Sequence, residues 1–158
     1  MVWLPLAKAI GHTAMVCLPL GKAIAGSIMN KFYDLVEQIY GRDTRYKPDA
    51  YEFVLQGLNF TQKKLKRQTH VSGAELALGL RDYAIDQYGA LACRVLTYWG
   101  INQTQDFGNI VFNMIEKKLL SKTKDDSLAD FKAVYDFKEA FANVLADSVI
   151  NGLGGKAR

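Results

Sequence analysis

The sequence predicts a mainly α-helical protein, a compact bundle of five or six helices within a single domain spanning residues 29–150. Apolar residues recur at the i, i+3, i+4 spacing of a helix face in one segment after another. Ser72 and Glu75 have the residue types and the spacing of a helix capping box. The chain has 158 residues, of which 49% are hydrophobic and 11% aromatic, so it is long enough to bury a core.

Residues 1–28 contain a tandem repeat, because MVWLPLAKAI at 1–10 returns as MVCLPLGKAI at 15–24. Prolines and lysines interrupt each apolar run, so none reaches the roughly 20 residues of a transmembrane helix. A secretory signal is not indicated either, since no basic residue precedes Trp3. We interpret 1–28 as a dispensable leader, with Met29 as the functional start; a weak amphipathic membrane anchor is the alternative.

The first helix is expected from Asn30 to Gly41. Its apolar stripe consists of Phe32, Leu35, Val36, Ile39 and Tyr40. A polar loop at 42–47 follows, and Pro48 suits the first position of the next helix, where its missing N–H is not needed. That helix is expected to continue to Leu65 on a stripe of Tyr51, Val54, Leu55 and Leu58.

The clearest helix start lies at Ser72. Its hydroxyl can accept a hydrogen bond from the Glu75 amide, while the Glu75 carboxylate accepts one from the Ser72 amide. Val71 and Leu76 occupy the positions of a hydrophobic staple. We expect this helix to end at Gly89 and a shorter one to end at Gly100. The apolar side of the shorter helix is expected to consist of Leu91, Val95 and Trp99.

Thr104 is the expected N-cap of the next helix. The apolar stripe of that helix consists of Phe107, Ile110, Val111, Met114 and Ile115. The segment 120–137 fits both strand and helix patterns, so we expect a short hairpin or an irregular segment there. Asp136 with Glu139 predicts another capping box and a last helix, and the glycines that follow predict a flexible tail at 151–158.

The charge of the chain comes from its ends. The formal net charge is +4, yet removing two leader lysines and two basic residues of the tail leaves 16 basic residues against 16 acidic ones. A general attraction to nucleic acid or anionic lipid is therefore not indicated. Cys17 and Cys93 do not form a disulfide framework, so we expect free thiols and a cytoplasmic location.

The stretch from Phe32 to Phe141 also carries a set of short motifs. They are RDTRY at 42–46, DAYEFV at 49–54, FTQ at 60–62, HVSGAEL at 70–76, WGI at 99–101, DFGNIV at 106–111, LSKT at 120–123, DS at 126–127, DF at 130–131 and YDF at 135–137. In these motifs the chain resembles a family of short, uncharacterised bacterial proteins, catalogued mainly from verrucomicrobial, planctomycete and acidobacterial genomes. Similar proteins tend to begin near Met29. The resemblance implies no particular activity.

The order of the expected elements is also that of a winged helix-turn-helix. Residues 104–118 would form the reading helix and 120–137 the wing. The outward face of that helix would consist of Gln105, Asp106, Asn109, Asn113 and Glu116. Its acidic residues would repel phosphates, and it offers no arginine for guanine. A winged helix that contacts protein is therefore at least as compatible with the sequence as one that reads DNA.

One basic cluster is the candidate nucleic-acid site. It consists of Lys63, Lys64, Lys66, Arg67 and His70. Four cations in full contact would give a salt slope of roughly −3 to −4 on duplex DNA, which means weak, non-specific binding. Only Phe60 lies nearby to stack on bases. The alternative is a solvated helix end whose cations favour the helix dipole.

Few residues suggest catalysis, so the sequence favours a non-enzymatic protein without a cofactor. His70 is the one histidine outside the leader and Cys93 has no cysteine partner there, so no metal site is expected. Ser72 beside His70 is better explained as a cap than as a nucleophile. No glycine-rich phosphate loop follows a strand.

The aromatic residues outnumber what one small core needs. Phe53 and Phe112 lie off the main stripes of their helices, which predicts a partner-binding surface; a larger core is the alternative. The sequence therefore predicts a binding module that engages a protein partner as a subunit or accessory factor of a larger assembly. Association with nucleic acid or the ribosome through residues 63–70 is the second hypothesis.

Overall fold

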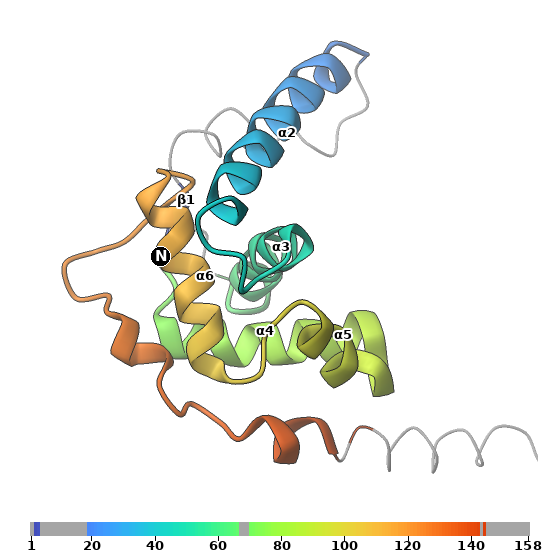
Figure 1. Ribbon diagram of the computed structural model, residues 1–158, viewed down its shortest axis with the longest axis vertical. Coiled ribbons are helices and arrows are strands. Elements are labelled where there is room, and N and C mark those ends of the chain that lie inside the picture. Colours follow the sequence, from blue (N-terminus) through green and yellow to red (C-terminus); the bar gives the residue numbers. More distant parts are fainter. Residues whose placement is uncertain (1, 4–18, 67–69, 143, 145–158) are drawn as a thin grey trace, which may run out of the picture.

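The computed structural model describes residues 2–3, 19–66, 70–142 and 144, with side chains from residue 30 on, and it confirms a mainly helical fold (Figure 1). The elements, in chain order, are β1 (Val2–Trp3), α2 (Pro19–Tyr40), α3 (Pro48–Lys64), α4 (Gly73–Tyr88), the 3₁₀ helix η1 (Gly89–Leu91), α5 (Ala92–Tyr98), α6 (Thr104–Glu116), β2 (Leu120–Ser121) and the 3₁₀ helix η2 (Leu128–Phe131). From Phe137 the chain is helical again to residue 142.

Helix α3 lies at the centre of the molecule, where it contacts α2, α4 and α6 (Figure 1). It begins at Pro48 as predicted, with the proline in the first turn. Because other helices cover it on several sides, its buried residues are not confined to one stripe. Tyr51, Val54 and Leu58 are fully buried, and Phe53 is also inside the core.

Helices α3 and α4 approach each other closely through two glycines. A Cβ atom on Gly79 would lie 1.9 Å from Thr61 Oγ1, and one on Gly57 would lie 2.3 Å from Leu80 Cδ2. The Thr61 hydroxyl is itself held in place, since it donates to the Gly57 carbonyl at 2.7 Å. The small side chains therefore set the distance between the two helices.

Replacing Gly79 with alanine should lower the free energy of unfolding by about 2 kcal/mol, because the added methyl group must push Thr61 and α3 away. Urea denaturation measures this loss. Gly41→Ala is the matched control, since a Cβ there meets only ordinary contacts, the nearest at 3.5 Å. Equal stability of the two variants would show that the helices are not packed this tightly.

The predicted helix start at Ser72 is present. The Glu75 amide donates to Ser72 Oγ at 3.3 Å, and the Ser72 amide donates to Glu75 Oε2 at 3.0 Å. Val71 and Leu76, at the staple positions, are fully buried. Of the capping box predicted at Asp136, one hydrogen bond is present, because the Glu139 amide donates to Asp136 Oδ1 at 3.0 Å.

Several predicted boundaries differ from the structure. The helix expected from Asn30 begins at Pro19 and so runs across residue 28. Thr104 is the first residue of α6 and not its N-cap, which is Gln103. The side chain of Thr104 is instead buried and accepts a hydrogen bond from the Val134 amide at 3.3 Å.

The short helix α5 buries a different side from the one predicted. Ala92 and Leu96 are fully buried, whereas 57% of Leu91 is exposed. Val95 and Trp99, the other two residues of the predicted apolar side, are partly buried. The predicted stripe at 91, 95 and 99 lies one position before the buried residues at 92 and 96. The sequence pattern favoured the large apolar Leu91 over the small Ala92 as the buried residue.

The segment 120–137 is mostly irregular. Its strand β2 pairs antiparallel with β1, with Val2 opposite Ser121 and Trp3 opposite Leu120. Within 120–137, all of which is described, no two strands pair with each other. The 3₁₀ helix η2 packs instead against α4 and α6. Of the two expectations for this segment, the irregular one describes it.

Candidate functional site

The described residues of the predicted basic cluster do not form one free cationic surface. Lys63 and Lys66 are exposed at the end of α3. Lys64 Nζ, however, lies 2.5 Å from Asp82 Oδ2. His70 Nε2 lies 3.0 Å from both carboxylate oxygens of Asp126. Arg67 lies outside the described residues. Two of the predicted phosphate-binding side chains therefore face carboxylates.

The Asp126 carboxylate connects His70, just before α4, to the loop that follows β2. Its side chain is only 3% exposed. It also accepts hydrogen bonds from the Thr123 amide at 2.8 Å and the Thr123 hydroxyl at 3.0 Å. Burial alone would raise the pKa of Asp126, but the hydrogen bonds from Thr123 and His70 outweigh it and lower the pKa. This arrangement stabilises a loop and needs no chemical role.

Because its pKa is lower in the folded state, the Asp126 carboxylate should stabilise the fold fully above its ordinary pKa of 3.8. This stabilisation should disappear as the pH falls through the lowered pKa of the folded state. Asp126→Asn should lower the free energy of unfolding at neutral pH by about 1–2 kcal/mol and flatten its decrease in acid. Thermal denaturation from neutral pH into acid measures both effects. Asp125→Asn, at an exposed neighbour, is the control; equal behaviour of the two variants would contradict the role of Asp126.

The polar face of α6 is also engaged within the chain. Tyr46 donates to Asp106 Oδ1 at 2.7 Å, and Asn109 donates to the Tyr46 hydroxyl at 2.8 Å. Asn113 donates to Asp43 Oδ2 at 3.1 Å and to the Tyr51 hydroxyl at 3.2 Å. The prediction that Asp106, Asn109 and Asn113 face outward is therefore wrong, because residues 43–51 pack against this side of α6.

The electrostatics of this network suit a structural role. The Arg45 side chain holds the pKa of Asp43 at about 2. Burial raises the pKa of Tyr46 to about 12, and its hydrogen bond to Asp106 acts in the same direction. Beside the network lies an open hollow of about 140 Å³, across which Arg42 pairs with Glu116 at 3.5 Å. Its other lining residues are Ile39, Asp43, Asn113 and Lys117. The mixed charges of this lining favour no particular ligand.

The two predicted partner-binding aromatics are not free surface. Phe53 is 3% exposed, so that prediction is wrong. The rings of Tyr83 and Trp99 lie 5.3 and 5.5 Å from its ring, because α4 and the end of α5 both pack on this side of α3. Phe112 is half-buried, and Lys122 Nζ lies 5.5 Å from its ring centroid.

Among the described residues, the two most exposed large hydrophobic side chains are Leu91, the last residue of η1, and Tyr98, the last residue of α5. Tyr98 is 68% exposed and Leu91 57%, whereas the other large exposed hydrophobics reach at most 39%. Arg94, also exposed, lies between them at the i, i+3, i+7 spacing that puts residues on one helix side. We call this surface, formed by Leu91 of η1 and by Arg94 and Tyr98 of α5, the α5 face. Figure 1 shows α5 at the edge of the molecule.

Lys47 completes this surface from a neighbouring loop. Its ammonium lies 3.1 Å from the centroid of the Tyr98 ring, which is a close cation–π contact. Its backbone amide donates to the Trp99 carbonyl at 3.1 Å, so the loop is joined to the end of α5. The cation holds the ring on one side while most of the ring remains exposed.

Sequence reasoning singled out neither Lys47 nor Arg94, and it placed Leu91 in the core. A comparison of the chain with protein-family models, with curated proteins and with solved structures finds no match in any of the three. In the described part of the chain, no helix has both the length and the apolar character that a membrane crossing requires. No group of three or more potential metal ligands comes together there either.

Proposed function

We propose that this protein is a non-enzymatic binding module that engages a protein partner through the α5 face, as a subunit or accessory factor of a larger assembly. The exposure of Leu91 and Tyr98 beside Arg94 carries the proposal. Tyrosine and arginine are enriched among the side chains that dominate binding energy at protein interfaces. A solvated helix face in a monomer would more commonly be polar along its whole length.

The size of the α5 face fits an anchor within a larger interface. Fully burying a leucine-sized or larger apolar side chain contributes roughly 1.5–3 kcal/mol. Leu91 and Tyr98 together could therefore supply several kcal/mol, which must offset the entropy lost on association. Contacts around the rim would supply the remainder.

The nucleic-acid hypothesis has less support from the contacts. Lys63 and Lys66 are exposed, but Lys64 and His70 face Asp82 and Asp126. Releasing them for phosphates would break these pairs, and the carboxylates left behind would repel the ligand. Among the described residues of the cluster this leaves two lysines, and two cations give little affinity at physiological salt.

Capture of a stoichiometric partner from a lysate of the source cells tests the proposal. The wild-type chain should retain a protein that the double variant Leu91→Ala/Tyr98→Ala loses, while both chains unfold at similar temperatures. Tyr40→Ala removes another exposed tyrosine, 38% exposed, and should retain the partner. Equal capture by all three chains, or capture by none, would contradict the proposal.

We also propose that the protein belongs to the short bacterial family it resembles and works in the reducing cytoplasm. A free, half-buried thiol at Cys93 supports that compartment. Cells are treated with a thiol-alkylating reagent, and the protein is then analysed by mass spectrometry. Cys93 should be alkylated, which identifies it as a reduced thiol. A mixed disulfide at Cys93 in the native protein would contradict this location.

A further inference from the structure

Arg94 differs from the other described arginines because it lacks an acidic partner. Arg42, Arg45 and Arg81 each pair with a carboxylate. Among the described residues, Arg94 and Lys47 have no carboxylate within ion-pair distance. Of the four arginines in the described part of the chain, three are thus matched by an acid, and Arg94, beside Tyr98, is not.

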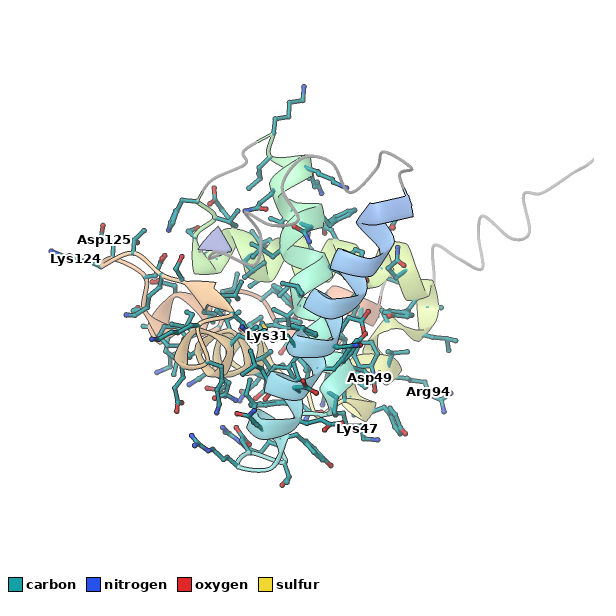
Figure 2. The ribbon with its side chains drawn as sticks, turned by 90° about the horizontal axis from the view of Figure 1, so that it is seen from above. Lys31, Lys47, Asp49, Arg94, Lys124 and Asp125 are labelled. Atoms are coloured by element: carbon teal, nitrogen blue, oxygen red, sulfur yellow. The ribbon has the colours of Figure 1, made fainter. Side chains whose placement is uncertain are left out.

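Figure 2 shows Lys47, Asp49 and Arg94 on one side of the molecule, with the Arg94 side chain extending away from the ribbon. Asp49 is the acidic residue labelled there, and it lies in the first turn of α3. The dipole of α3 already favours a negative charge at that position. Asp49 also lies outside ion-pair distance of Lys47 and Arg94, so both cations can pair with an acid supplied from outside the chain.

We infer that the partner presents an acidic segment in which carboxylates flank an aromatic or aliphatic side chain. Its carboxylates pair with Arg94 and Lys47, and its apolar side chain packs on Tyr98 and Leu91. Arginine can hold a carboxylate with two parallel hydrogen bonds, which fixes the register of such a segment. This inference rests on the proposed function of the α5 face and specifies what that face recognises.

A nucleic acid is also anionic, but this surface suits it less well. Single-stranded nucleic acids stack their bases on successive aromatic rings. The α5 face has a single aromatic ring, that of Tyr98, and Lys47 covers one side of it. Leu91, 57% exposed, offers an aliphatic contact that a base or phosphate does not need. An acidic peptide uses both the apolar and the cationic side chains.

Selection from a phage-displayed library of random dodecapeptides tests the inference, with counter-selection on the Leu91→Ala/Tyr98→Ala variant. Enriched peptides should combine aspartate or glutamate with an aromatic or aliphatic residue. Their affinity should fall about tenfold with Arg94→Glu and decrease with added salt. Lys124→Glu, on the loop at the opposite side of Figure 2, should leave it unchanged. Circular dichroism checks that each variant is folded.

The outcomes separate this inference from the function on which it rests. Peptides that require Tyr98 but are neutral or basic, and that ignore Arg94→Glu, would overturn the acidic partner and leave the binding function intact. If no peptide requires Tyr98, the inference is wrong, and capture from lysate then decides the function separately. Binding of a single-stranded RNA oligonucleotide that requires Tyr98, with no such peptide, would overturn both.

Discussion

Replacing Gly100 with alanine should lower the free energy of unfolding by roughly 3–5 kcal/mol. Gly100 has a φ of +92°, a region that residues with a Cβ rarely adopt. The added Cβ would also lie 2.0 Å from the Arg45 carbonyl oxygen. That oxygen belongs to the backbone, so no change of rotamer relieves the clash, and the loop at 42–47 must separate from the end of α5.

Gly89→Ala separates the two causes of this effect. Gly89 also has a positive φ, +50°, but no atom lies within 4 Å of the position that its Cβ would occupy. With a ψ of −126°, its replacement should therefore cost backbone strain alone, about 1–3 kcal/mol. Urea denaturation of both variants measures the difference. Equal losses would mean that the contact with Arg45 contributes nothing.

Asp106→Ala should be the second most damaging change, with a loss of about 3 kcal/mol. The carboxylate accepts hydrogen bonds from the backbone amides of Asn102 and Gln103 at 2.9 and 3.1 Å, and one from the buried Tyr46 hydroxyl. Alanine leaves all three donors without this acceptor. Because Asp106 caps α6 and also joins it to residue 46, one change affects a helix start and a tertiary contact.

The control for this prediction is Glu116→Ala, at the other end of α6. Glu116 pairs with Arg42 at the surface, where both side chains are about 70% exposed, so its loss should be nearly neutral. Tyr46→Phe combined with Asp106→Ala completes a double-mutant cycle. The two changes should be less than additive, because either one removes the same hydrogen bond. Additive losses would contradict a direct interaction.

Local chemistry explains which parts of the fold could be predicted from the sequence. The caps at Ser72 and Asp136 and the start at Pro48 depend on residues within one helical turn, and all three are present. Phe53 and Asp106 depend on distant partners. The sequence gives no sign that Tyr46 meets a carboxylate 60 positions away, so Asp106 was expected to face solvent.

The candidate site was harder to predict for the same reason. In a helix as short as α5, a few residues do not establish an apolar stripe. The sequence pattern therefore does not show that Ala92 is buried and that Leu91, just before the helix, is exposed. Leu91 was therefore expected inside the core. Lys47 comes close to Tyr98 only because its amide bonds to the Trp99 carbonyl, a contact between distant segments.

Site-specific photo-crosslinking in the source cells tests the central claim, the binding role of the α5 face, most directly. A photoreactive amino acid at Thr97, an exposed position beside Tyr98, should form one discrete adduct, and the same group at Lys124 should form none. The Thr97 adduct should disappear when Leu91→Ala/Tyr98→Ala is added. An adduct that survives those changes, or equal labelling from both positions, would contradict the claim.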